Sequence, residues 1–329
     1  MLFALPPETA ERVADALLSR RSIWRALAPA FRVRDERLKA GLAGISLNNP
    51  VGLAAGYDKD CELLPSVAAL GFGYVIGGTV TEKSRSGNPR PRVLRYVKDR
   101  SLINSLGFPG RGLESAARQL ERSRSAMSGT PVVVSVSGVT PDEIVRCHRR
   151  LEPLVDAVEL NISSPNTVGL RAFHRPRALA DLLAAVNDPR NKPLFVKLPA
   201  PAAGEDADTL LALADTCVEN GVDGLTVANS RPAEDGRLAT GAGGLSGKLV
   251  FEDMLRLVSK VRTRVGDGTA INACGGIFTG DDAWRALRAG ATTVQLLTGL
   301  IYRGPSIAKR MNRELLAIMD REGVDSLPR

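Results

Sequence analysis

Two asparagines and two serines stand close together in residues 161–167, Asn-Ile-Ser-Ser-Pro-Asn-Thr, directly after an apolar, β-branched run. The run predicts a buried strand, and the polar cluster behind it predicts an active-site loop. Asn161 and Asn166 can each donate and accept hydrogen bonds, which suits the edge of an imide or a flavin ring. Pro165 favours an extended backbone at Ser164 and helps to fix the direction of its hydroxyl. A simple Asx or Ser turn is the competing interpretation.

Two lysines also occur where a cation has no packing role. Lys59 follows a stretch of small residues, and Lys197 ends an apolar run. Because an unpaired ammonium group is costly to bury, we expect each to face an anion or an electron-rich ring; a lysine that reaches solvent at a rim is the alternative. Two cations and several amides, without an acid pair or metal ligands, suit an organic cofactor that carries the redox step, and a phosphate-bearing flavin fits.

Cysteine and histidine content argues against several kinds of site. The four cysteines, at positions 61, 147, 217 and 274, are far apart and form no Cys-x-x-Cys pair, so no zinc site or disulfide framework is expected. The two histidines, His148 and His174, are too few for a multi-histidine metal site and make a Ser-His-Asp triad improbable. We expect both at the surface, His148 within a charged helix. This pattern fits a reducing cytosol.

Charge and hydropathy narrow the range of partners. The 329 residues are 44% hydrophobic and 24% charged, with a net charge of +8. The basic residues are spread among 36 acids, and aromatic residues make up 4%, so an anionic ligand or membrane surface is favoured over nucleic acid. No apolar run reaches the roughly 18 residues that span a bilayer, and the N-terminus lacks the apolar core of a signal peptide. We therefore expect no transmembrane segment.

Strands and helices alternate along most of the chain, and these elements must position the polar residues. We expect strands at 50–56, 73–77, 132–136, 155–160, 194–198, 224–227, 270–273 and 293–297. We expect helices at 62–70, 112–126, 141–151, 176–186, 207–219, 250–261, 281–289 and 305–319. Continuously apolar strands are typical of buried parallel sheets, and eight such units predict an α/β fold, a (β/α)8 barrel. A doubly wound open sheet is the rival, but no Gly-x-Gly-x-x-Gly follows the first strand.

Residues 1–41 differ from the barrel expected at 42–329. Residues 7–18 and 22–31 have the periodicity of two short amphipathic helices. Such helices suit either a helical cap on the barrel or a segment that lies at a membrane interface.

The reacting residues of such barrels lie at the C-terminal ends of the strands. The residues expected there are Lys59, Thr79, Ser135, Asn161, Ser164, Lys197, Asn229, Ser230, Gly275, Gly276, Thr298 and Gly299. Gly275-Gly276 and Thr298-Gly299 suit phosphate binding through backbone N–H groups, although a Gly-Gly pair alone more often marks a turn. Residues 243–247, Gly-Gly-Leu-Ser-Gly, are expected to add a flexible loop.

Several short strings together resemble the dihydroorotate dehydrogenase family, in its membrane-associated, quinone-dependent class, over about residues 2–320. They lie at 49–60, 78–81, 87–92, 103–108, 161–167, 244–247 and 304–305. The resemblance implies a barrel with bound FMN that oxidises (S)-dihydroorotate to orotate in pyrimidine synthesis. It also implies a quinone as the final electron acceptor and a peripheral position on the cytoplasmic side of a membrane. The segment 1–41 would then form the membrane-facing entrance through which the quinone reaches the flavin.

The same resemblance implies a role for individual residues. Ser164 would take the C5 proton of dihydroorotate as general base, and Phe108 and Thr167 would shape its surroundings and proton path. A serine at this place indicates the quinone-dependent class, since soluble relatives usually have cysteine. The implied substrate contacts are Lys59, Asn104, Asn161, Asn166, Asn229 and Ser230. The implied FMN contacts are Ala55, Lys59, Thr79, Ser135, Asn161, Lys197, Ala228, Gly247, Gly276 and Thr298. No metal is implied.

The chain departs from the family pattern on the flavin and acceptor sides. Ser135 stands where the family usually has asparagine, and Ala228 where it often has serine or threonine. Leu297 replaces a quinone-facing tyrosine and Pro109 an asparagine, whereas Arg95 matches the arginine of the quinone tunnel. Two alternatives stay open: an FMN oxidoreductase with another acceptor or a related cyclic substrate, and a ligand-binding barrel that has lost turnover. The sequence does not indicate an oligomeric state.

Overall fold

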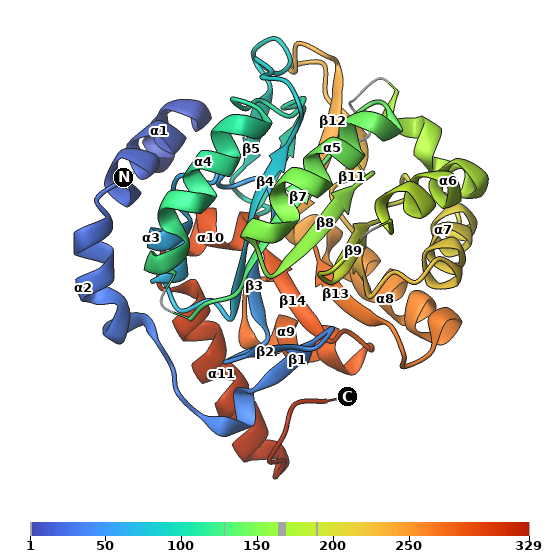
Figure 1. Cartoon of the computed structure of the whole chain (residues 1–329). Coiled ribbons are helices and arrows are strands. Elements are labelled where there is room, and N and C mark those ends of the chain that lie inside the picture. The colour runs from blue at the N-terminus through green and yellow to red at the C-terminus, as the bar shows by residue number, and fades with distance from the viewer. Residues whose placement is uncertain (1, 128, 164–168, 189, 329) are drawn as a thin grey trace.

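Eight parallel strands close into a barrel in this computed structural model, which describes residues 2–127, 129–163, 169–188 and 190–328 (Figure 1). The strands follow one another around the barrel in chain order, and the last pairs with the first. They are β3 (Val51–Leu53), β4 (Tyr74–Val80), β7 (Val132–Val136), β8 (Ala157–Asn161), β9 (Leu194–Lys197), β10 (Gly224–Val227), β13 (Ala270–Cys274) and β14 (Thr293–Leu296). The predicted (β/α)8 barrel is therefore confirmed.

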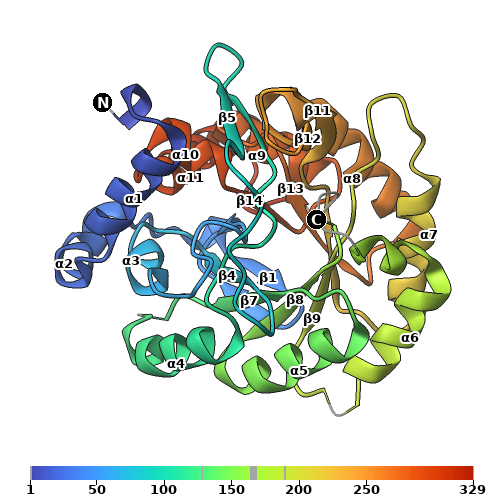
Figure 2. The same ribbon diagram turned by 90° about the horizontal axis from the view of Figure 1, so that it is seen from above.

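Helices ring the outside of the barrel (Figure 2). The barrel strands are buried on both faces, because these helices cover the outside and side chains fill the inside. Gly52 shows how tight the filling is, since a Cβ there would lie 2.3 Å from Cζ of Tyr74. An apolar layer fills the lower interior, and a small sheet of β1 (Ala40–Leu42) and β2 (Ile45–Leu47) packs against it. The open end that remains for a site is the one at the carboxyl ends of the strands.

The outer helices begin and end close to the predicted positions. They are α3 (Leu64–Ala68), α4 (Leu113–Ser123), α5 (Pro141–Leu151), α6 (Pro176–Val186), α7 (Asp208–Glu219), α8 (Phe251–Val265), α9 (Gly280–Arg288) and α11 (Ile307–Glu322). The short helices are η3 (Arg124–Ala126), η4 (Glu152–Leu154), η5 (Leu170–His174), η6 (Lys248–Val250) and α10 (Thr298–Arg303). Capping boxes begin α5, through Thr140 and Glu143, and α9, through Thr279 and Asp282.

His148 is a correction to the sequence interpretation, because its side chain is only 1% exposed. It belongs to the inner face of α5 together with Ile144, Cys147 and Leu151, which recur at helical spacing. The charged residues of that helix lie between these positions, so a helix that looks charged in sequence still buries its histidine.

A four-stranded antiparallel sheet at the open end of the barrel was not predicted. It comprises β5 (Val93–Tyr96), β6 (Ser101–Asn104), β11 (Arg231–Glu234) and β12 (Ala242–Gly247). The expected flexible loop at 243–247 is thus wrong, since these residues form β12. Their glycines permit close approach: a Cβ on Gly243 would lie 2.6 Å from the Asn104 carbonyl oxygen, and one on Gly244 would lie 2.2 Å from Ser230 Oγ.

The N-terminal segment forms the two expected helices, α1 (Pro7–Leu18) and α2 (Arg21–Phe31), flanked by η1 (Leu2–Ala4) and η2 (Glu36–Leu38). They lie beside the barrel on the side of α3, and α2 contacts α3 while α1 contacts β5 (Figures 1 and 2). Among the described helices, none combines the length and the apolar character needed to cross a bilayer.

Candidate active site

A cavity of about 450 Å³ opens at the carboxyl ends of the barrel strands. The predicted site residues that line it are Ala55, Lys59, Thr79, Asn104, Phe108, Asn161, Lys197, Asn229, Ser230, Gly247, Gly276 and Thr298. Ser135 and Ala228 are buried and do not line it. Ser164, Asn166 and Thr167 lie outside the residues that the structure describes. The fold therefore gathers most of the predicted residues, from distant parts of the chain, around one space.

A chain of hydrogen bonds joins the polar side chains at the ends of β4, β8 and β10. Asn161 Nδ2 donates to Thr79 Oγ1 at 2.9 Å, and Asn161 Oδ1 accepts from Ser163 Oγ at 2.7 Å. Asn229 Nδ2 donates to the same Ser163 Oγ, also at 2.7 Å. These bonds orient both amides before any ligand arrives, as a site must do to hold a planar ring at several points.

Ser135 supports this chain from β7. Its hydroxyl is fully buried and shares a hydrogen bond of 3.1 Å with Thr79 Oγ1. Ser135 thus acts on the site through Thr79.

Lys197 ends β9 with its side chain almost fully buried, at 4% exposure. Burial lowers its pKa, but the neighbouring Cys274 and Glu159 act in the opposite direction and leave the pKa above its usual value. The ammonium group therefore stays charged at neutral pH. A buried cation at the wall of a cavity favours a ligand that carries or gains negative charge.

Lys59 meets an anion from outside the barrel. Its Nζ donates to Glu11 Oε1 of α1 at 2.5 Å. Asp15 lies one turn further along α1, and its pKa is raised to about 6 by burial and by the charge of Glu11. The N-terminal helices are thus tied electrostatically to the loop that follows β3.

The loops after β12 and β13 bring their backbones together where a phosphate is expected. Gly276 has φ of +71°, and a Cβ on it would lie 2.8 Å from the Gly247 carbonyl oxygen. Gly247 itself has φ of +97°. Ser246 Oγ and Thr298 Oγ1 lie 3.0 Å apart at the start of α10. Glycines here leave the backbone N–H groups uncovered by side chains, and together with the two hydroxyls they fit a phosphate. With the buried Lys197 nearby in the same cavity, the arrangement fits a phosphate-bearing flavin.

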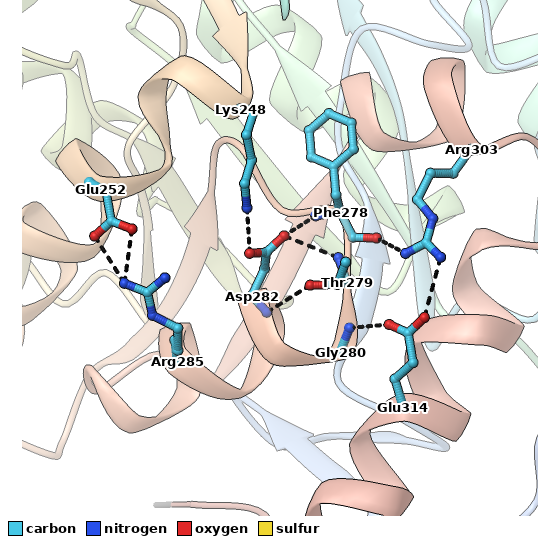
Figure 3. A network of polar contacts seen from close by, with 9 residues as sticks. All are labelled: Lys248, Glu252, Phe278, Thr279, Gly280, Asp282, Arg285, Arg303 and Glu314. Carbon is cyan, nitrogen blue, oxygen red and sulfur yellow. Dashed lines mark hydrogen bonds and ion pairs between the residues drawn. The ribbon is translucent and has the colours of Figure 1, made fainter. Parts of the chain in front are cut away.

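Charged side chains bind the backbone of residues 278–280, just after this glycine region (Figure 3). Asp282 accepts from Phe278 N at 2.9 Å and from Lys248 Nζ at 2.5 Å, which joins α9 to η6. Glu314 of α11 accepts from Gly280 N at 2.5 Å and from Arg303 Nη2 at 3.3 Å, which joins α11 to α10. Phe278 bonds to Asp282 of α9 through its N–H group and to Arg303 of α10 through its carbonyl oxygen, so the loop after β13 is anchored to two helices close to its flexible glycines.

The same cavity continues away from the barrel as an apolar passage. Its walls there come from η1, α1, α2 and the end of β14, and they include Phe3, Ala10, Ala14, Leu17, Leu18, Trp24 and Leu297. Arg95 stands at this passage, where Nη1 donates to the Leu5 carbonyl oxygen at 2.8 Å and the guanidinium lies 4.9 Å from the Phe3 ring centre. The N-terminal helices thus form part of the cavity wall.

A family model described as dihydroorotate dehydrogenase matches residues 37–319. The chain belongs to the dihydroorotate dehydrogenase family. The resemblance inferred from the sequence strings is therefore confirmed, and with it comes a family whose members generally use a flavin.

Relatives within the dihydroorotate dehydrogenase family match nearly the whole chain. The dihydroorotate dehydrogenase (quinone) of Thermus thermophilus is 39% identical and covers 99% of this chain and 97% of its own. That of Thermobifida fusca is 39% identical, with 89% and 83% covered. A crystal structure of DHODH in complex with ferulenol from Eimeria tenella matches with a TM-score of 0.84 at 30% identity, covering 98% of this chain and 96% of that one.

Two residues of this dihydroorotate dehydrogenase site were missed by the sequence interpretation. Ser163 precedes the serine that was singled out, and only its bonds to two asparagines distinguish it. Glu11 lies on an amphipathic helix in which several acids are equivalent by sequence, and its pairing with Lys59 depends on how α1 packs. A pairing between residues this far apart in the chain leaves no pattern in the neighbouring sequence from which it could be predicted.

Proposed function

We propose that this chain oxidises (S)-dihydroorotate to orotate in pyrimidine synthesis, with FMN as the bound cofactor and a quinone as the final electron acceptor. The observation that carries the proposal is a single cavity that joins two chemically different ends. One end holds oriented amides and a buried ammonium group, which suit a polar pyrimidine and a flavin. The other is an apolar passage, which suits a hydrophobic acceptor.

The residues around the glycine region are proposed to hold FMN. Backbone N–H groups near Gly247 and Gly276, with the Thr298 hydroxyl, take the phosphate, and Lys197 lies beside the ring where negative charge gathers on reduction. Bound FMN accepts a hydride equivalent from one substrate and gives up electrons to another. The charge on Lys197 makes electron arrival more favourable, because it stabilises the anionic form of the ring.

The substrate end is proposed to bind dihydroorotate through its ring amides and its carboxylate. Asn104, Asn161 and Asn229, which line the cavity, meet the ring, with Asn166 as a fourth amide, and Lys59 and Ser230 meet the carboxylate. Ser164 takes the C5 proton as the C6 hydride leaves, with Phe108 and Thr167 shaping its surroundings. A serine hydroxyl is a weak base, so this step depends on the departing electrons having a sink.

The acceptor end is proposed to open at a membrane surface. Exposed apolar side chains on the N-terminal helices are Phe3, Leu5, Val13, Leu17, Ile23 and Leu27. An amphipathic helix pair with basic residues between such side chains suits peripheral binding to an anionic bilayer, here on the cytoplasmic side. A quinone dissolved in that bilayer then reaches the cavity without crossing water.

An absorption spectrum tests the proposal directly. Purified protein should be yellow, lose its flavin absorbance when (S)-dihydroorotate is added without oxygen, and regain it with a short-chain quinone. Absorbance that dihydroorotate leaves unchanged would refute the substrate assignment.

A second candidate keeps the flavin and changes the acceptor, and Leu297 favours it, because an aliphatic chain lines the passage where the family has tyrosine. Reoxidation rates with quinone, fumarate, NAD and oxygen separate the two. A preference for any of the last three would support this second candidate.

A further inference from the structure

A ring of buried polar side chains crosses the inside of the barrel, in a layer that the proposed mechanism does not use. Thr226 Oγ1 donates to Glu159 Oε2 at 2.7 Å and accepts from Asn272 Nδ2 at 3.4 Å. Thr293 Oγ1 donates to Asn272 Oδ1 at 2.6 Å and lies 2.8 Å from the Tyr74 hydroxyl. Five of the eight barrel strands contribute to this ring: β4, β8, β10, β13 and β14.

Glu159 is the one acidic member of that ring, and nothing about the ring's packing requires an acid. Its side chain is fully buried, and among the described residues its Oε1 has no hydrogen-bond partner. A buried carboxylate with one bare oxygen is unfavourable unless a cation offsets it. A cation in the neighbouring layer of the barrel would offset this cost.

Strand register points to Lys197 as this cation. Asn161, two residues after Glu159 and therefore on the same face of β8, pairs in register with Lys197 of β9. Thr226 of β10 pairs with Lys197 from the other side. The hydrogen bond between Glu159 and Thr226 joins β8 to β10, so it crosses the strand that carries Lys197. The acid and the lysine face the same interior, one layer apart.

We propose that Glu159 is the counter-charge of Lys197, and that it sets how strongly the site stabilises negative charge on a bound flavin. The inference rests on the proposed function, because it takes FMN to lie over Lys197. Glu159 does not touch the flavin or the substrate and is a positioning residue. Its carboxylate offsets part of the lysine's field, so the cofactor is a weaker electron acceptor than Lys197 alone would make it.

Sulfite binding measures this field without turnover. The sulfur lone pair of sulfite forms a bond to flavin N5, and the negative charge it brings spreads toward N1, so no other reactant is needed. In Glu159→Gln the negative charge one layer below Lys197 is lost, and the affinity for sulfite should rise by about tenfold. Titration of the flavin absorbance with sulfite gives the dissociation constant directly.

Two matched variants separate charge from structure. Thr226→Val removes the hydrogen bond to Glu159 and keeps the charge, so its sulfite affinity should stay within about threefold of wild type. Lys197→Met should weaken sulfite binding. In the Lys197→Met background, Glu159→Gln should raise the sulfite affinity by a smaller factor than it does in wild type. If Glu159→Gln does not fold, Glu159→Asp draws the carboxylate back by one methylene and should change the affinity measurably.

The outcomes also distinguish this inference from the proposed function. If dihydroorotate bleaches the wild-type flavin and Glu159→Gln or Glu159→Asp binds sulfite as wild type does, Glu159 is no counter-charge and the proposed function stands. Wild-type protein that takes up no FMN would overturn both.

Discussion

Ser163 connects the two asparagines that the proposed substrate ring would meet, because it donates to Asn161 and accepts from Asn229. Its neighbour Ser164 has the proposed role of general base. Two adjacent serines thus have different tasks, one in holding the amides and the other in moving a proton, and kinetics can tell these tasks apart.

Ser164→Ala should slow anaerobic reduction of the flavin by about 10² to 10⁴-fold, because a positioned base contributes that much to proton transfer. Orotate binding, measured by the shift of the flavin spectrum, should change little. Equal reduction rates in the variant and wild type would remove Ser164 from the base role.

Ser163→Ala is the matched comparison and should show the opposite pattern. Without the hydroxyl, Asn161 Oδ1 and Asn229 Nδ2 each lose a partner, so the amides lose their fixed orientation. We expect orotate to bind about tenfold more weakly, with a smaller loss in the limiting reduction rate. Stopped-flow reduction over a range of dihydroorotate concentrations measures both quantities.

At this scale most of the residues singled out from the sequence line the cavity, and short strings such as those around Lys59 and Asn161 pointed to them. Local strings work because a strand end and the loop behind it lie within a few residues of each other. The roles of Glu11 and Glu159 could not be predicted from the sequence. Each depends on a partner that only packing brings near, through the docking of α1 in one instance and through barrel register in the other.

Among the secondary-structure elements, too, some could be predicted from the sequence and others could not. The eight barrel strands were predictable because buried parallel strands are continuous apolar runs. Strand β12 was not, because its glycines look like a loop and are explained only by the close approach of Asn104 and Ser230. The N-terminal helix α1 was predicted as a helix, and the family resemblance implied that it lies at the entrance to the flavin, but its ion pair with Lys59 was not predicted.

The docking of α1 should depend on pH through Asp15, whose pKa is raised to about 6 by burial, with Glu11 acting in the same direction. Between about pH 4 and 6 the folded chain holds a proton there that the unfolded chain has lost, so stability falls as pH rises through this window. Asp58, with a pKa also raised to about 6 by burial, acts in the same direction.

The melting temperature at pH 7.5, relative to that at pH 4.5, should therefore be higher in Asp15→Asn than in wild type. The pH dependence that remains is due to Asp58 and other groups. Arg12→Gln, on the exposed face of the same helix, should keep the wild-type difference. Differential scanning calorimetry at the two pH values provides the measurement, and an unaltered difference in Asp15→Asn would show that the helix does not respond to this carboxyl.

The molecule as a whole combines a rigid barrel with an apolar helical face on one side of its mouth. On α2, Ile23 and Leu27 are 48% and 43% exposed. Because that face lies beside the passage, it is the surface through which we propose that the chain contacts a bilayer.

The double variant Ile23→Ser with Leu27→Ser should bind several-fold less to vesicles that contain anionic lipid, because two exposed apolar side chains that would enter the bilayer are lost. Leu249→Ser, at a residue 48% exposed on η6, is the control and should bind as wild type does. Cosedimentation measures the bound fraction. Equal binding by all three proteins would place the membrane contact elsewhere or nowhere.

The two-ended cavity has a consequence for inhibition. A hydrophobic compound lodged between α1, α2 and Leu297 would compete with the quinone and leave the dihydroorotate end open, so it would inhibit competitively against one substrate only. The wall there carries the carboxylate of Glu11 as well as aliphatic chains. Selective compounds for this passage should therefore be lipophilic and need no basic nitrogen, because the Glu11 carboxylate on its wall is already paired with Lys59.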